Sequence, residues 1–532
     1  MKRLTEYLNN GKRKNVLVLI IIFLPLLQAG IIALYCMAAY KSALPVPQWN
    51  DEGAYYTLIK TWLATGQPLG YWGFDGGHAI LGTGSAWSPA ILFPYAVFGM
   101  MFGWHYSSVF YANLLFLTLA QVLFLLLVKP ERKMQFRMFL LQAVSSIVLL
   151  YSVTLMSELL RFSLAIILAG MIYRLYFGKC GPVFRFVIMP LFLLAAIQIY
   201  IFFVFAVPLY VFGAMKDCKS GTWWKKALVS LTALLFAGGA SYYLLHLISS
   251  NYNIYKTENL LKALQSFDIM AVFRAVLSMV KEGLAGFAGC FLSHMGHGLF
   301  QWFVPFLIVL LFLPFGVLCA DGWKMRNKKQ DFWDRDHILC AQGVFGAALF
   351  LGAFITVYSL EPFTFFRSMG IVVLFTMYLL MMTERKRLFS VLLLFYGAGM
   401  IFLPANLKDF TKERYPGQET VREWRELETE LEAQITLRAD GDPWKNTVVL
   451  YTLEPKVLAA MPAGSGVNMM LYSDEIPEKA EYLFFSKESV RRRSDWLEHD
   501  YAKIRHEHQD LLMEKYQAVW ESEKYILYKK IG

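Results

Sequence analysis

Between Lys14 and Lys41 the chain carries no charged residue, and this feature limits what the protein can fold into more than any other. The stretch contains VLVLIIIFLPLLQAGIIALYCMAAY, which is longer than the roughly 20 residues that a helix needs to cross a bilayer. It is too long for the apolar core of a signal peptide, and it lacks a convincing small-residue cleavage site. We therefore expect a first transmembrane helix that is retained, with its basic N-terminal flank in the cytoplasm.

Further apolar runs follow along the chain, so the sequence predicts about eleven membrane spans. They lie at about residues 105–128, 138–156, 160–177, 186–198, 200–214, 226–247, 298–319, 338–359, 368–383 and 388–404. Hydrophobic residues make up 57% of the chain and charged residues 17%, whereas soluble domains are about 45–50% apolar and about 25% charged. The composition therefore argues against a soluble enzyme and against a disordered chain.

The short outer loops are poorer in Lys and Arg, and most of the basic residues between the predicted spans lie in every second loop. These residues are Lys129, Arg132, Lys133, Arg137, Lys179, Arg185, Lys216, Lys219, Lys225, Lys226, Lys324, Arg326, Lys328, Lys329, Arg335, Arg385, Lys386 and Arg387. The positive-inside rule predicts that these loops are cytoplasmic, and an odd number of spans then puts the C-terminal region outside. The net charge of +11 divides into +16 before residue 405 and −5 after it. A nucleic-acid partner is not expected, because the basic charge does not lie on the folded-domain candidate.

Residues 405–532 differ sharply from the transmembrane part, 1–404. Charged residues are 43 of 128 in this region and 48 of 404 before it, so it is too polar to span a membrane. QETVREWRELETELEAQI has the periodicity of a helix, NTVVLYT and EYLFFS are typical of short strands, and AVWESEKYILYKK predicts two strands about a turn. The sequence predicts a mainly α, polytopic membrane protein with a small extracytoplasmic α/β domain at its C-terminus.

The first outer loop, residues 41–104, opens with PVPQWNDEGAYYTLIKTWLATGQ. Asn50 is a suitable N-cap and Gly66 a suitable C-cap, and the apolar residues between them predict an amphipathic helix that lies in the membrane interface. Its first turn carries Asp51 and Glu52, where the helix N-terminus stabilises carboxylates. Both acids could equally be ordinary first-turn residues on a solvated loop. A second interfacial or re-entrant helix is expected from Pro89 to about residue 103.

Two other outer loops carry ionisable residues at the ends of predicted spans. Glu158 and Arg161 are three residues apart and hence on one helix face. Glu361 and Arg367 flank aromatic residues in TVYSLEPFTFFRSMG, and arginine is well suited to binding phosphate. Ionisable residues are costly at such positions and functional by default. The alternatives are a self-neutralising Glu158–Arg161 ion pair and an interfacial anchor at Arg367.

Several further motifs are interpreted as structural. The amphipathic stretch FDIMAVFRAVLSMVKEGL contains Arg274 and Lys281 as candidate lipid-headgroup contacts. His294 and His297 have a spacing that could bind metal, but no third ligand is evident, so we expect a loop. The six cysteines contain no CxxC motif and indicate neither a zinc site nor a disulfide framework.

An acidic pair that opens the first outer loop, interfacial helices, a many-span bundle and an outer C-terminal domain together resemble the GT-C superfamily of membrane glycosyltransferases. That group includes the protein O-mannosyltransferases, the lipid A aminoarabinose transferases and the bacterial RgtA/B/C/D-like enzymes. The matching residues are Asp51 and Glu52, followed by Tyr55 and Tyr56, and the similarity in layout covers about residues 10–405. The resemblance implies transfer of a hexose or pentose from a polyprenyl-phosphate carrier to a glycan, lipid or protein outside the cytoplasm, with inversion.

The resemblance also implies roles for particular residues. Asp51 is the first candidate for the catalytic base or a metal contact, Glu52 is the second, and Glu158 matches a second acidic position of the family. The remaining candidates, for binding the donor or its lipid phosphate, are Arg161, Arg367, Tyr55 and Glu361. The resemblance leaves open a divalent cation, Mg²⁺ or Mn²⁺. The expected location is a plasma membrane, and the absence of Asn-x-Ser/Thr acceptors favours a bacterial one.

Two other functions are compatible with many spans and large outer loops. A polysaccharide polymerase or ligase would join lipid-linked glycans and would not require an acid at Asp51. A transporter or flippase would predict paired halves and charges at the bilayer midplane, and we find no obvious internal repeat. The chain also lacks the GxxxxGK[ST] phosphate loop, so it is not itself an ATPase of that kind.

Overall fold

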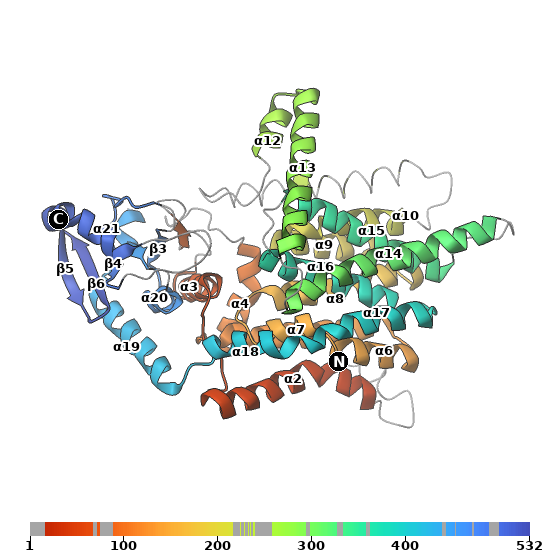
Figure 1. The fold of residues 1–532 in the computed structure, drawn as a ribbon, viewed down its shortest axis with the longest axis horizontal. Coiled ribbons are helices and arrows are strands. Elements are labelled where there is room, and N and C mark those ends of the chain that lie inside the picture. Colours follow the sequence, from red (N-terminus) through yellow and green to blue (C-terminus); the bar gives the residue numbers. More distant parts are fainter. Residues whose placement is uncertain are drawn as a thin grey trace.

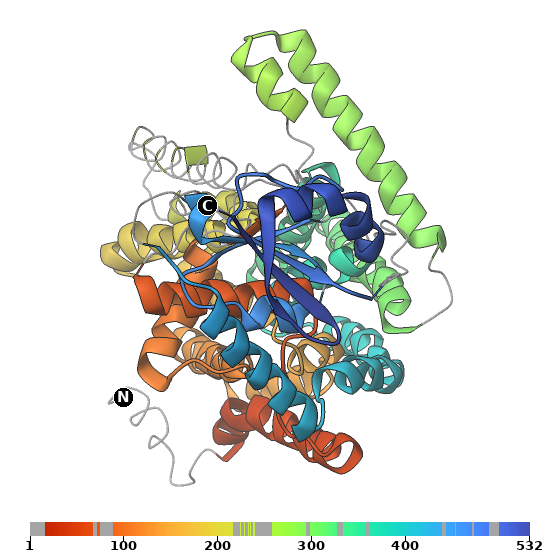
Figure 2. The same cartoon turned by 90° about the vertical axis from the view of Figure 1, so that its left-hand side faces the viewer.

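A computed structural model describes most of the chain. The described residues are 16–66, 72–74, 89–215, 258–293, 298–326, 334–357, 362–438, 443–452, 454–470, 473–488 and 500–531, with six isolated positions between 224 and 239. A bundle of helices forms one part of the molecule, and a sheet built from the C-terminal region covers one end of it (Figures 1 and 2).

The helices of the bundle follow the apolar runs of the sequence. In chain order they are α2 (Val16–Tyr40), α3 (Asn50–Thr65), α4 (Pro89–Phe102), α5 (Ser108–Val128), α6 (Arg132–Ala143), α7 (Ser146–Tyr151), α8 (Glu158–Phe177), α9 (Met189–Ile199), α10 (Ala206–Met215), α12 (Glu258–Gln265), α13 (Ile269–Ser293), α14 (Gly298–Arg326), α15 (Arg335–Val357), α16 (Pro362–Leu380), α17 (Lys386–Ala398) and α18 (Leu403–Arg414). A π-helical turn, η1 (Phe184–Ile188), precedes α9, and a 3₁₀ turn, η2 (Ile201–Phe205), precedes α10. Helix α8 lies between α5 and α16 in the centre of the bundle.

The expected number of eleven spans is not confirmed. Among the described residues, five helices are long and apolar enough to cross a membrane: α2, α5, α8, α14 and α15. The pair α17 and α18, bent by 49°, could add a sixth. The run at 138–156 is broken between α6 and α7, and the run at 226–247 lies outside the continuously described ranges. Apolar runs overcount spans because a helix buried inside a bundle is apolar all round even when it is short.

Two of the basic loops predicted to share one side meet at one end of the bundle. Lys133 pairs with Glu384 at 2.6 Å. Arg137 donates from Nη1 to the carbonyl oxygens of Met381 and Thr383, at 2.9 and 2.6 Å. These contacts join the first half of α6 to the turn before α17, although the two are about 250 residues apart. That this end faces the cytoplasm remains a prediction.

The C-terminal region forms a six-stranded sheet at the other end of the bundle. Its strands are β2 (Thr447–Tyr451), β3 (Gly466–Met469), β4 (Tyr482–Ser486), β5 (Tyr516–Glu521) and β6 (Tyr525–Lys530), joined by β1 (Trp72–Phe74). The order is β1-β3-β2-β4-β6-β5, with the first four strands parallel and the β4–β6 and β6–β5 pairs antiparallel. The helices of this region are α19 (Gln418–Gln434), α20 (Pro455–Ala460), α21 (Tyr501–Glu507) and α22 (Gln509–Lys515).

The predicted helix at 418–434 and the four predicted strands are confirmed, whereas β1 and β3 were not foreseen. Strand β1 comes from the first outer loop, and its Trp72 pairs with Val467 of β3. A three-residue segment carries too little periodicity to be recognised as a strand, and its partner lies almost 400 residues away. The outer loop and the C-terminal sheet therefore form one structural unit.

Helix α3 lies between the bundle and this sheet domain. It begins at Asn50, one residue earlier than expected, and ends at Gly66, whose φ of 73° is the left-handed conformation that favours glycine. It packs on α4 on one side and on α20 on the other, where Thr57 donates to the carbonyl of Leu458 at 2.7 Å. The helix is therefore buried along most of its length, because the C-terminal domain covers the face that we expected to meet water.

Candidate active site

Asp51 stands in the first turn of α3 and forms an ion pair with Arg367 of α16. Its Oδ2 lies 3.1 Å from Arg367 Nη1. One third of the Asp51 side chain is exposed, compared with 18% of the Arg367 side chain. This pair joins the first outer loop to the start of a late bundle helix, and it keeps a carboxylate at a surface that solvent or a substrate can reach.

Glu158 lies directly behind this pair, at the first residue of α8. Its Oε1 is 3.4 Å from Arg161 Nη1 and 3.9 Å from Arg367 Nε, so one carboxylate faces two guanidinium groups. Glu158 is almost fully buried, with 1% of its side chain exposed. A charge in such surroundings is tolerated only when it is paired. Glu158 therefore holds the guanidinium groups of Arg161 and Arg367 beside one carboxylate oxygen.

Three polar atoms beside this cluster are buried without a hydrogen-bond partner among the described residues. They are Glu158 Oε2, Arg161 Nε and the hydroxyl oxygen of Tyr151, which ends α7. Nearly all buried polar groups in proteins find a partner, so a group of unpaired ones requires an explanation. Their shared location indicates a place where a polar ligand or water supplies the missing bonds.

Glu52 is next to Asp51 in sequence but has entirely different surroundings. Its side chain is fully buried, and Oε2 accepts hydrogen bonds from the backbone N–H groups of Gln48 and Trp49, at 2.8 and 3.0 Å. Oε1 accepts from the backbone N–H of Leu155 at 3.0 Å and from Arg414 Nε at 2.9 Å. Both oxygens are thus occupied by protein donors. Glu52 connects the start of α3, the turn before α8 and the end of α18.

Arg414, the partner of Glu52, is equally buried. Its guanidinium carbon lies 3.7 Å from the centre of the Trp49 ring, a cation–π contact, in addition to the bond to Glu52. The sequence analysis missed this residue because it follows the last apolar run by ten positions and belongs, in sequence, to the polar tail. The signal that could have revealed it is the continuation of helical periodicity from 403 to 414.

Aromatic side chains frame the charged cluster. The Arg161 guanidinium lies over the ring of Tyr200, 4.5 Å from its centre, and the Tyr200 hydroxyl donates to Ser368 Oγ at 2.8 Å. Ser157 Oγ donates to the Tyr55 hydroxyl at 3.1 Å, and burial raises the pKa of Tyr55, so the phenol stays neutral. Tyr200 stands between the end of α9 and the start of η2, and the sequence analysis did not single it out.

Six of the seven predicted site residues are therefore gathered at one end of the bundle. They are Asp51, Glu52, Tyr55, Glu158, Arg161 and Arg367. Glu361 lies outside the described residues, as do Asp75 and His78 of the first outer loop and the His294–His297 pair. With Arg414 added, the three carboxylates and three guanidinium groups of this cluster are formally neutral.

This arrangement does not fit a divalent cation. The Arg367 guanidinium lies between Asp51 and Glu158, the two carboxylates that could share an ion, and Glu52 uses both oxygens on N–H donors. A magnesium site needs carboxylate or carbonyl oxygens in near-octahedral geometry, which a guanidinium group at its centre prevents. Among the described residues, no group of three His, Cys, Asp or Glu side chains is arranged to hold a metal.

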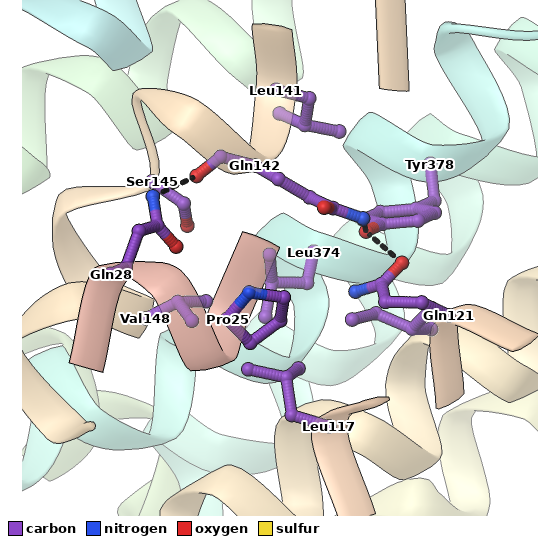
Figure 3. Close-up of a pocket in the computed structure, with 11 residues that line it drawn as sticks. Pro25, Gln28, Leu117, Gln121, Leu141, Gln142, Ser145, Val148, Leu374 and Tyr378 are labelled. Carbon is purple, nitrogen blue, oxygen red and sulfur yellow. Dashed lines mark hydrogen bonds between the residues drawn. The ribbon is translucent and has the colours of Figure 1, made fainter. Parts of the chain in front are cut away.

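A second polar cluster lies deeper in the bundle, where glutamines from three helices meet (Figure 3). Gln142 Nε2 donates to the Tyr378 hydroxyl at 3.3 Å, and that hydroxyl donates to Gln121 Oε1 at 2.9 Å. Gln28 of α2 donates to the carbonyl of Gln142 at 3.4 Å. The cavity between them measures about 10 Å³, enough for one water molecule. It is too small for a sugar, and we interpret it as interhelical hydrogen bonding within the bundle.

No family model matches the sequence, and no curated protein matches it either. Among solved structures, ArnT from Cupriavidus metallidurans bound to undecaprenyl phosphate is similar at 11% identity, over 97% of this chain and 98% of that chain, with a TM-score of 0.47. The oligosaccharyltransferase AglB from Archaeoglobus fulgidus, in complex with an inhibitory peptide and a dolichol-phosphate, is similar at 12% identity, over 87% of this chain and 69% of that chain, with a TM-score of 0.45. Both are GT-C glycosyltransferases, the group that the sequence resembles, and at these identities the similarity concerns the fold alone.

Proposed function

We propose that this protein is a membrane glycosyltransferase of GT-C type, which moves a hexose or pentose from a polyprenyl-phosphate carrier to an acceptor outside the cytoplasm. One observation carries the proposal. A partly exposed carboxylate, Asp51, is paired with Arg367, and Arg367 shares the buried acid Glu158 with Arg161, at the end of the bundle that the sheet domain covers. Lipid phosphates are named with two of the solved structures above, but the proposal rests on the residues of this chain.

Asp51 is the proposed general base. Its carboxylate takes the proton from an acceptor hydroxyl as the hydroxyl oxygen attacks the anomeric carbon of the donor. The bond between that carbon and the phosphate oxygen breaks in the same step, and its electron pair leaves with the lipid phosphate. A single displacement of this kind inverts the anomeric carbon. Arg367 holds one Asp51 oxygen, which fixes the direction in which the carboxylate points.

The arginines are the proposed binding groups for the departing phosphate. Guanidinium groups bind phosphate oxygens with two parallel hydrogen bonds, and they stabilise charge that develops as the bond breaks. Arg367 is the first candidate because it reaches the partly exposed side of the cluster, and Arg161 lies behind it. Glu158 holds both arginines in place, and its unpaired oxygen marks the inner wall of the binding site.

Glu52 is proposed as a positioning residue. With four N–H donors on its two oxygens, it has little capacity to accept a further proton from a substrate. Its contacts fix the N-terminus of α3, and hence Asp51, against the turn that leads into α8. Tyr55 is proposed to line the site, where its hydroxyl accepts a hydrogen bond from Ser157 Oγ. The proposed mechanism uses no metal ion.

The proposed orientation rests on the positive-inside rule. The end of the bundle with Asp51 and the sheet domain faces the extracytoplasmic side of a bacterial plasma membrane, and the end with the basic loops faces the cytoplasm. The division into a transmembrane part, 1–404, and an outer domain, 405–532, remains our proposal. Helix α18 crosses this boundary and brings Arg414 into the site, so the two parts are coupled there.

Surface-glycan composition tests the proposal. We would compare, by mass spectrometry, the parent strain, a deletion strain and deletion strains that carry Asp51→Asn or Glu419→Gln. Glu419 is the matched control, because it is also an acid in the first turn of a helix but is exposed, and its ion pair is with Arg422 of the same helix. Immunoblots of membranes would establish equal expression of the two variants.

The proposal predicts that one sugar disappears in the deletion strain, that Glu419→Gln restores it and that Asp51→Asn does not. Full restoration by Asp51→Asn would refute the assignment of Asp51. Loss of long polymers with every single sugar retained would point to a polymerase or ligase instead. Accumulation of a lipid-linked intermediate on the inner side, with no change that depends on Asp51, would point to a flippase.

A further inference from the structure

A helical hairpin made of α12 and α13 projects sideways from the bundle (Figures 1 and 2). Helix α13 lies close to α15 near the end of the bundle and crosses the direction of α14 steeply in both views. Only residues 294–297 separate α13 from α14, which is long and apolar enough to span a membrane. The C-terminal end of α13 therefore lies close to the start of a helix that can span a membrane.

One face of α13 exposes large apolar side chains to its surroundings. At 100° per residue, the side chains of this stripe fall within about a third of the helix circumference. They are Ile269, Met270, Phe273, Val276, Leu277 and Leu284, and Phe273 is 62% exposed. Phe267, in the turn between the two helices, is 91% exposed. Monomeric soluble surfaces rarely carry so continuous an apolar stripe, which indicates a partner.

The charged residues of α13 are arranged around this stripe. Arg274 and Lys281 flank it on one side, each about a quarter turn from its centre. Glu282 and Ser278 lie on the opposite face, where Ser278 Oγ donates to Glu282 Oε1 at 2.8 Å. The buried side of the helix, with Met279, packs against the bundle. An apolar stripe bordered by basic residues is the pattern of a helix that lies in a membrane interface.

A groove between α12 and α13 adds a third cation to this border. It is lined by Lys262 and Arg274 together with Asn259, Ser266 and three alanines, and no acidic residue lines it. Asp268, at the turn, accepts a hydrogen bond from the backbone N–H of Ala271, at 2.9 Å. Two basic side chains thus lie in the groove between the two helices, beside the apolar stripe of α13.

We propose that the α12–α13 hairpin is a membrane-surface anchor that binds anionic phospholipids. The apolar stripe enters the boundary between headgroups and acyl chains, and the three basic residues contact lipid phosphates. A bilayer is the occupant that matches the apolar stripe, its basic border and the continuation into α14, whose Phe312 and Phe315 are also exposed. This inference does not depend on the proposed glycosyl transfer.

Hydrogen–deuterium exchange of the full-length protein in lipid nanodiscs tests this proposal. The discs contain phosphatidylcholine alone, phosphatidylcholine with phosphatidylglycerol, or phosphatidylcholine with inorganic phosphate in the buffer. The variants are Arg274→Gln with Lys281→Gln for the border, Phe273→Ser with Leu277→Ser for the stripe, and Glu282→Gln as the control on the opposite face. Amides of α5 and α8 in the same samples report whether each variant is folded.

We expect phosphatidylglycerol to slow exchange in α13 by about fivefold for each basic residue that reaches the lipid surface. The border variant should lose most of this effect and keep only the contribution of Lys262, the stripe variant should exchange rapidly in all discs, and Glu282→Gln should behave like the parent. Equal exchange with and without phosphatidylglycerol would overturn the proposal. Slowing by inorganic phosphate alone would identify a free-anion site instead of a lipid surface. Unchanged exchange in the stripe variant would show that something other than lipid covers this face.

Discussion

Neutralising Glu52 should destabilise the fold, whereas neutralising its neighbour Asp51 should not. The physical reason lies in burial. Asp51 and Arg367 form a partly exposed pair, and such pairs contribute about 0–1 kcal/mol. Glu52 and Arg414 are buried, at 0% and 1% exposure of their side chains, and breaking a buried pair by removing one partner costs about 3–5 kcal/mol. We expect Glu52→Gln to lower the free energy of unfolding by that larger amount.

The structure suggests why the effect should be near the upper end of this range. The glutamine keeps the shape of the side chain but cannot accept all four N–H bonds, because its amide nitrogen is a donor. The Arg414 charge would then remain buried over Trp49 without a counterion. Removing both charges, in Glu52→Gln with Arg414→Gln, should recover part of the loss.

The assay monitors unfolding of the purified protein in one detergent by its tryptophan fluorescence. It compares the parent, the single variants Glu52→Gln and Arg414→Gln, and the double variant that carries both substitutions. Glu419→Gln again serves as the exposed-acid control. Glycan transfer would be measured on the same preparations at a temperature where all of them are folded. If Glu52→Gln unfolds like the parent yet transfers no sugar, Glu52 is the reacting acid and our reasoning from its occupied oxygens is wrong.

Three further predictions follow from the same geometry. Arg367→Lys should weaken binding of the lipid-phosphate donor about tenfold or more, measured as a rise in the donor KM, because lysine cannot hold Asp51 and phosphate with a planar fork; an unchanged KM would contradict this role. Glu158→Gln should lower both kcat and the unfolding temperature, since two arginines then lose their shared counterion. A fall in only one of these two quantities would show that Glu158 does not serve both catalysis and stability. Lys60→Met should loosen the docking of the sheet domain on α3, because Lys60 pairs with Glu428 of α19; limited proteolysis should then cut near residue 438 faster, and equal rates would show that the ion pair does not contribute to docking.

Local patterns in the sequence predicted several elements well. The first span, the helix at 418–434 and four of the six strands are recognisable because hydrophobic periodicity and turn residues act over a few neighbours. The candidate acids and arginines could also be found, because a charge at the end of an apolar run is rare and costly and therefore stands out. The number of spans could not, since short buried helices and true spans have the same composition.

Tertiary structure alone decided which of these residues meet and how they differ. Asp51 and Glu52 are adjacent in sequence, but one is partly exposed beside Arg367 and the other is buried against Arg414, 362 positions away. Contacts across such distances depend on how whole helices pack, and no local pattern encodes them. The same holds for β1, a three-residue strand whose partner lies in another part of the chain. The sequence by itself determined a membrane bundle with charged residues at its outer ends, and packing alone separated the proposed base from the residue that holds it in place.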